Sequence, residues 1–164
     1  MRSIGLRICV VSMALLSGCG YSTQRPFPQN VRTVCVEMFQ NRDFRKDLEF
    51  PLSEAVIKRI EMDTHYRLAS RSQADTIISG EIVEIRQNTL GDDFRSDLPR
   101  ETAVTFVDSF RRKDQRSGKI LAERRRLSYT TTYIKPVGES FFDGASRGLE
   151  GVAEQLVEAM ESTW

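Results

Sequence analysis

The sequence predicts an α+β fold, a two-layer sandwich in which a four-stranded mixed sheet carries two helices on one face. Segments with period-two alternation and segments with helical spacing follow one another in the order β-α-β-β-β-α. Each predicted element has one apolar side, and stacking the helices on the sheet would bury both layers. The last three strands would form an antiparallel meander, and the first would join by a right-handed crossover through the first helix.

The first half of the chain supplies one strand and one helix. Residues 31–39 alternate and are predicted to be a strand, which the polar residues 40–43 would end. Residues 48–64 are predicted to be a helix, because Pro51 suits a first turn and apolar residues recur after it at helical spacing. His65 would follow as a solvated or capping residue.

The second half supplies three more strands. They are predicted over 76–87, 102–112 and 119–134, which are rich in β-branched and aromatic residues. The glycine and proline in residues 88–101 predict a loop, and Asp114 and Gly118 predict a tight turn at 114–118.

The last element is predicted to be a helix over 141–162. Gly148 and Gly151 lower its intrinsic stability by up to about 1 kcal/mol each, so we expect them where the helix approaches the sheet closely. Its apolar stripe consists of Ala145, Leu149, Val152, Ala153, Leu156 and Met160.

Residues 1–18 have the layout of an export signal. Arg2 and Arg7 precede an apolar run that is shorter than the roughly 20 residues needed to span a bilayer. The run ends in Leu16-Ser17-Gly18-Cys19, which resembles the lipobox of bacterial lipoproteins. That resemblance implies cleavage before Cys19 and a diacylglyceryl group on its thiol, with an additional N-acyl chain giving a stable anchor.

Removal of the signal leaves one domain's worth of chain behind a tether. Residues 19–30 contain Pro26 and Pro28 and no apolar period, which predicts an extended tether, and 31–164 would form the domain. Gly20, rather than an acidic residue, follows the lipidated cysteine and favours the outer membrane over the inner one.

Composition and motifs argue against several function classes. The 24 Lys and Arg residues balance 23 Asp and Glu residues, so nucleic acid is not an expected partner. Once Cys9 is removed and Cys19 lipidated, Cys35 has no partner for a disulfide. A single histidine and the lack of nucleophile, metal-ligand or phosphate-loop patterns predict no metal, no cofactor and no enzymatic activity. The adjacent acids Asp92 and Asp93 suit a solvated loop better than acid–base catalysis.

Several short motifs follow one another in a set order along the chain. They are Gly18-Cys19-Gly20-Tyr21, Val34-x-Val36-x-x-Phe39-x-Asn41, Ala74-Asp75 with Ile77-Ile78-Ser79-Gly80-Glu81, the turn from Asp114 through Ser117-Gly118-Lys119-Ile120-Leu121, and the closing helix. With these motifs the chain resembles the LptE family of lipopolysaccharide-assembly lipoproteins over most of its length, with a departure at residues 44–49. The resemblance implies an outer-membrane lipoprotein on the periplasmic side that plugs the lumen of an LptD-type β-barrel and binds lipopolysaccharide. The alternative is another tethered binding module, such as an activator of a peptidoglycan synthase, because such lipoproteins can share the first-strand pattern.

The meander predicts where a lipopolysaccharide site would lie. Its strands run up, down and up, so the segment 88–101 and the segment 135–140 share one end of the sheet. That end would gather Arg95, Arg100 and Lys135, and cationic side chains of these types bind phosphates. A solvated loop whose acidic residues neutralise these cations is the alternative.

Three successive arginines, Arg124 to Arg126, stand in the last predicted strand. Strict alternation would place Arg125 on the face of Leu121 and Leu127, and the other two arginines on the opposite face. A polar sheet face is the simple interpretation of this run.

Overall fold

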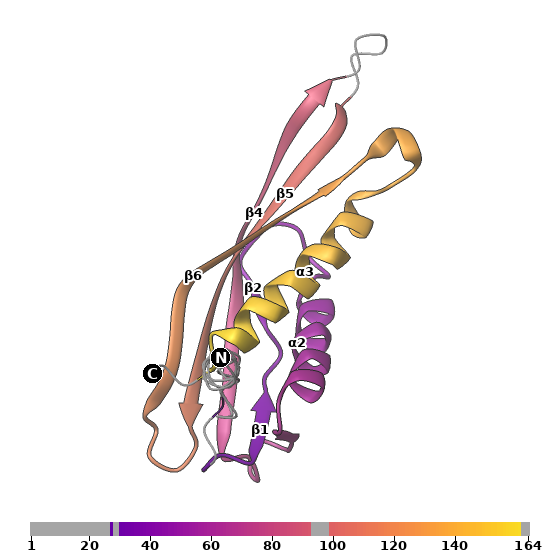
Figure 1. Cartoon of the computed structure of the whole chain (residues 1–164). Coiled ribbons are helices and arrows are strands. Elements are labelled where there is room, and N and C mark those ends of the chain that lie inside the picture. The colour runs from indigo at the N-terminus through magenta and orange to yellow at the C-terminus, as the bar shows by residue number, and fades with distance from the viewer. Residues whose placement is uncertain (1–26, 28–29, 93–98, 162–164) are drawn as a thin grey trace, which may run out of the picture.

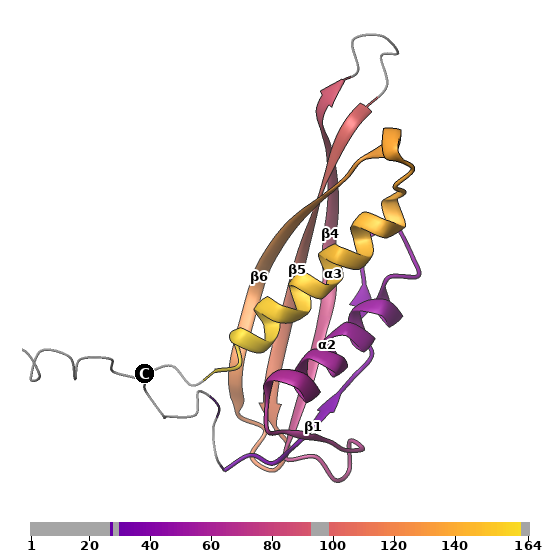
Figure 2. The same ribbon diagram turned by 45° about the vertical axis from the view of Figure 1, so that its right-hand side comes forward.

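The computed structural model of the chain describes residue 27 and residues 30–92 and 99–161. A long, twisted sheet forms one layer and two helices cover one of its faces, as Figures 1 and 2 show. The α+β sandwich is therefore confirmed. Its elements are β1 (Thr33–Val36), β2 (Gln40–Asn41), α2 (Glu49–Asp63), β3 (Arg67–Leu68), β4 (Thr76–Asp92), β5 (Pro99–Asp114), β6 (Ile120–Tyr133), the 3₁₀ turn η1 (Lys135–Val137) and α3 (Phe141–Glu158).

The sheet has six strands where the sequence predicts four. Its order is β3-β1-β4-β5-β6, and β2 pairs with β4 beside β1. β1 is parallel to both β3 and β4, whereas β4, β5 and β6 form the antiparallel meander. The two additional strands, β2 and β3, are two residues long each. Strands this short show no period, so the prediction of a polar break at residues 40–43 was wrong about β2.

The β4–β5 hairpin is longer than predicted. The ladder continues through Asn88 opposite Ala103, Thr89 opposite Thr102 and Gly91 opposite Glu101. The predicted loop at 88–101 is therefore wrong over most of its length. Pairing satisfies the backbone of both strands whatever their side chains, so a polar, glycine-containing segment remains a strand here.

The turn between β5 and β6 has the predicted chemistry. The Asp114 carboxylate accepts hydrogen bonds from the amides of Arg116 and Ser117, and Gly118 has a φ of 71°. An Asp that bonds to backbone amides ahead of it, followed by a glycine at positive φ, stabilises a tight turn.

The two helices differ in how their ends are capped. Ser140 and Asp143 form a capping box at the start of α3, whereas no side chain caps α2 at Leu48. Thr64 forms the C-cap of α2 and its hydroxyl bonds to the Ile60 carbonyl. The neighbouring His65 is exposed, with Nε2 3.3 Å from the Val31 carbonyl oxygen. α3 ends at Glu158, four residues before the predicted end.

Glycines bring α3 close to the sheet, as predicted. A side chain at Gly148 would collide with the ring of Phe106, and one at Gly151 would collide with the ring of Tyr129. α3 therefore lies directly on β5 and β6, and α2 packs beside it (Figure 2). In the described part of the chain, no helix is long and apolar enough to cross a membrane.

Asp75 fastens the start of β1 to β4. Its carboxylate accepts hydrogen bonds from the amides of Arg32 and Thr33 and from the Thr33 hydroxyl, each at 3.0 Å. These bonds, first that from Arg32, hold the pKa of Asp75 below its ordinary value.

The connection between β2 and α2 is ordered by its own polar side chains. The Asn41 amide donates to the Arg45 carbonyl at 2.6 Å, and the Asp43 carboxylate accepts from the Ile85 amide at 3.0 Å. Arg45 then stacks on the ring of Phe141, 4.2 Å from its centroid. This connection thus ties the beginnings of both helices to β4.

A bulge corrects the predicted alternation in the arginine run. Leu127 pairs with Asp108 and Arg124 pairs with Phe110, so β6 carries one extra residue between them. Ladder partners share a face of the sheet, which puts Arg124 on the face of Leu127 rather than opposite it.

Candidate functional site

The predicted site residues are described to different extents. Cys19 and Arg95, and with them the proposed signal peptide and most of the tether, lie outside the described residues. Arg100 belongs to β5, and its side chain is not described. Lys135 opens η1 and is exposed. Its ammonium group has no ion pair among the described residues.

The structure places η1 and the outer ends of β4 and β5 (residues 88–92 and 99–103) at the same end of the molecule, here called the tip. Both lie at the top of Figures 1 and 2, and η1 lies beside β5. The arrangement of the two segments thus follows from the meander. The gathering of Arg95, Arg100 and Lys135 stays a prediction, because the first two side chains are not described.

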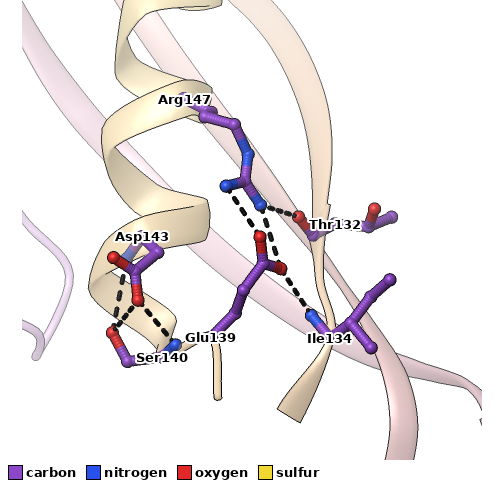
Figure 3. Close-up of polar contacts among 6 residues, drawn as sticks. All are labelled: Thr132, Ile134, Glu139, Ser140, Asp143 and Arg147. Atoms are coloured by element: carbon purple, nitrogen blue, oxygen red, sulfur yellow. Dashed lines mark hydrogen bonds and ion pairs between the residues drawn. The ribbon is translucent and has the colours of Figure 1, made fainter. Parts of the chain in front are cut away.

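An exposed network of ion pairs and hydrogen bonds holds the η1 turn in place (Figure 3). The Glu139 carboxylate accepts from the Ile134 amide at 2.7 Å and from both terminal nitrogens of Arg147, at 3.1 and 3.2 Å. Arg147 also donates to the Thr132 carbonyl at 2.8 Å. The bond from Ile134, followed by that from Arg147, keeps the pKa of Glu139 below its ordinary value. The turn is thereby fixed both to the end of β6 and to the first turns of α3.

Ser140 and Asp143 complete the attachment of this turn. The Ser140 hydroxyl and amide both donate to the Asp143 carboxylate, at 2.6 and 2.7 Å. Gly138 closes η1 with a φ of 91°, which favours glycine. A rigid turn holds Lys135 at a set position, so less entropy is lost when a ligand binds there.

Several apolar side chains near Lys135 in the chain or on the neighbouring hairpin are exposed. Val137 is 72% exposed, Ile134 37%, and Leu90 near the end of β4 is 59% exposed. Sequence reasoning missed this surface, although Ile134 and Val137 flanking a lysine and a proline were a usable signal. An exposed cation beside apolar side chains suits an amphiphilic ligand with an anionic head and hydrocarbon chains.

Two buried ionisable side chains lie elsewhere, in the layer between the sheet and the helices. Asp108 is 1% exposed and neither carboxylate oxygen has a hydrogen-bond partner, so burial raises its pKa to about 7. Arg112, also 1% exposed, lies 4.7 Å from the centroid of the Tyr66 ring and donates to the Met160 carbonyl at 3.4 Å. Arg112 ties the end of α3 to the sheet, and neither residue reaches the tip.

The described residues contain no group of three potential metal ligands. A sheet with one uncovered face and two covering helices defines a small two-layer α+β domain.

The family model LptE, described as lipopolysaccharide-assembly, matches residues 31–162, and the chain belongs to this family. The resemblance predicted from the sequence is confirmed. LptE proteins are assembly lipoproteins, so the chain has a role in lipopolysaccharide assembly as a lipoprotein of the cell envelope.

Solved structures share the fold at low sequence identity. A hypothetical protein from Chlamydia trachomatis superposes with a TM-score of 0.52 and 10% identity, covering 79% of this chain and 98% of that one. A protein from Xanthomonas campestris gives 0.52 and 10%, covering 82% and 84%. An uncharacterized lipoprotein B from Nitrosomonas europaea gives 0.51 and 12%, covering 85% and 88%. No curated protein matches the chain.

Proposed function

We propose that the protein is an outer-membrane lipoprotein that plugs an LptD-type β-barrel from the periplasmic side and binds lipopolysaccharide at the η1 tip. Family membership over residues 31–162 is the observation that carries the proposal. Lys135 would contact a phosphate of the lipid, joined by Arg95 and Arg100. The anchor would be the lipidated Cys19.

The positions of the two ends of the domain support separate roles, anchoring at one end and lipid binding at the other. Phe27, which belongs to the predicted tether, is buried and contacts the ring of Tyr66 just after α2. That end of α2 lies at the bottom of Figures 1 and 2, whereas η1 lies at the top. The chain therefore enters from the membrane anchor at one end and presents Lys135 at the other.

The uncovered face of the sheet is compatible with the lumen of a barrel. Thr105 and Thr130 bond to each other there at 2.8 Å, and Arg111 pairs with Glu123. The interiors of outer-membrane barrels are polar. A polar face can contact such a wall without leaving apolar surface in water.

Co-purification tests the partner. The tagged full chain, extracted from outer membranes in mild detergent, is expected to retain a large β-barrel, identified by mass spectrometry. Fractionation with the inner membrane and capture of a peptidoglycan synthase would instead favour the activator function.

Binding of purified lipopolysaccharide by the full chain tests the tip. The double variant Arg95→Asp/Lys135→Asp should bind at least tenfold more weakly, since one charge-assisted contact contributes about 1.5–3 kcal/mol. The control variant Arg67→Asp/Lys119→Asp reverses two charges at the other end of the sheet and should bind as wild type. Equal affinity of all three proteins would exclude the tip as the site.

A further inference from the structure

A hollow far from Lys135 opens among strands β4, β5 and β6 and the β1–β2 connection. Its volume is about 490 Å³, and its lining includes Ser109, Arg111, Glu123, Arg124 and Arg125. Ser109 and Arg111 alternate with the buried Phe110, and Arg111 and Glu123 are ladder partners. Ser109, Arg111 and Glu123 therefore lie on the face of the sheet that the helices leave open.

The acidic side chains that line the hollow already form ion pairs with arginines. Glu37 pairs with Arg71, and Glu81 pairs with Arg42 at 2.9 Å, both partners standing outside the lining. Glu123 accepts from Nε and Nη2 of Arg111, at 3.1 and 2.9 Å. Each carboxylate is thus matched by one guanidinium.

Two guanidiniums remain without a matched carboxylate. Arg124 donates only to the carbonyl of the preceding Glu123, at 3.1 Å, within the described residues. The side chain of Arg125 is 90% exposed, and its Nε lies 3.9 Å from Glu123, a carboxylate that Arg111 already holds. Counted together with Arg42 and Arg71, the arginines in and around the hollow outnumber its three glutamates by two.

Both arginines line the hollow and belong to the edge strand β6, at or next to its bulge. β6 has an edge position in the sheet (Figure 1), and its extra residue falls between Arg124 and Leu127. A bulge redirects side chains and ends regular pairing, and such sites are frequent next to binding sites.

We propose that this hollow binds a phosphate group, with Arg124 and Arg125 as its cationic partners and the Ser109 hydroxyl as an additional donor. Guanidinium groups bind phosphate with two parallel hydrogen bonds. The Ser109 hydroxyl makes only a long contact to Glu81, at 3.5 Å, which a phosphate oxygen would replace. The phosphate belongs either to a lipid headgroup or to a free phosphate ester. The site goes beyond the proposed function, because it uses another surface and none of the tip residues.

Amide NMR of the ¹⁵N-labelled full chain in maltoside micelles tests the site. The probes are inorganic pyrophosphate and, separately, phosphatidic acid incorporated into the micelles. Saturable shifts are expected at Ser109, Arg111 and Arg124 with at least one probe. Saturation by pyrophosphate alone assigns the site to free phosphate esters, and saturation by phosphatidic acid alone assigns it to headgroups.

Matched variants separate a site from general electrostatic attraction. Arg124→Gln/Arg125→Gln should weaken the affinity at least tenfold, while Arg67→Gln/Lys119→Gln removes two charges elsewhere and should stay within twofold of wild type. Unshifted resonances of the buried core show that both variants are folded. The proposal is overturned if neither probe gives a saturable shift, if both variants weaken binding equally, or if polyglutamate binds as well as the phosphate probes.

Discussion

Gly148 on α3 lies directly against the ring of Phe106 on β5, with no room for a side chain between them. Phe106 is fully buried, so its ring has nowhere to move. One turn later Gly151 meets the ring of Tyr129, which is only partly buried. Two glycines therefore set the distance between α3 and the sheet. The ring that faces Gly148 is fully buried, whereas the ring that faces Gly151 is only partly buried.

Alanine at Gly148 should destabilise the protein, although alanine is the better helix former. The propensity gain is at most about 1 kcal/mol, while overpacking costs about 1–3 kcal/mol. Gly151→Ala should cost less, because the Tyr129 ring can turn outward. Urea unfolding measures both, with Gly91→Ala, where a methyl group meets no neighbour within 4 Å, as the control. An unchanged midpoint for Gly148→Ala would contradict the packing described.

Asp108 should make the protein less stable as the pH rises from about 4 to about 7. Burial raises its folded-state pKa from 3.8 to about 7, so the folded protein binds this proton more tightly than the unfolded chain. The stabilisation is complete below the unfolded pKa and is lost through this window, at up to about 1.4 kcal/mol per pH unit.

The variant Asp108→Asn tests the contribution of this carboxyl. Carboxylates with lowered pKa values, such as Asp75, act in the opposite direction at lower pH, so the informative quantity is the difference between variant and wild type. The free energy of unfolding of Asp108→Asn should rise relative to wild type between pH 4 and 7. The exposed control Glu158→Gln should follow wild type, and a parallel course for Asp108→Asn would refute the assignment.

Breaking the Glu139–Arg147 contact should loosen the tip without unfolding the domain. Glu139→Gln removes the charge that holds Arg147 and weakens the bond to the Ile134 amide. We expect hydrogen exchange at Ile134 and Gly138 to accelerate at least tenfold, and lipopolysaccharide binding to weaken several-fold although Lys135 is intact. Glu84→Gln, which breaks an exposed pair with Arg86 on β4, should change neither measurement.

Lipidation of Cys19 can be tested by metabolic labelling. Cys19→Ser should abolish incorporation of radioactive palmitate and leave the precursor uncleaved, since the thiol is the acceptor. Cys35→Ser, which removes a partly buried cysteine inside the domain, should leave labelling unchanged. Normal labelling of the Cys19→Ser protein would exclude it as the modified residue.

The predictable part of the fold is the part with a long hydrophobic period. α2, β4, β5, β6 and α3 recur near their predicted positions, because their buried residues repeat every two or every three to four positions. β2 and the outer part of the β4–β5 hairpin were missed because backbone pairing alone maintains them.

The candidate site was predictable only in outline. Sheet topology predicted that Lys135 lies at the hairpin end. No local sequence pattern predicted that Glu139 and Arg147 would fix the turn, because their contact depends on how α3 returns to β6. The β6 bulge was equally hidden: one extra residue in a strand leaves the alternating pattern of its two halves intact. Both features depend on tertiary pairing rather than on local sequence.

The length of β4 gives the molecule a fixed reach. At about 3.3 Å per residue, its 17 residues extend over roughly 55 Å, which exceeds the 40–45 Å thickness of a bilayer with its headgroups. A paired ribbon of this length acts as a ruler, because it holds the two ends of the domain at a set separation. Removing the pairs Asn88–Ala103 and Thr89–Thr102 would shorten this ruler by about 7 Å.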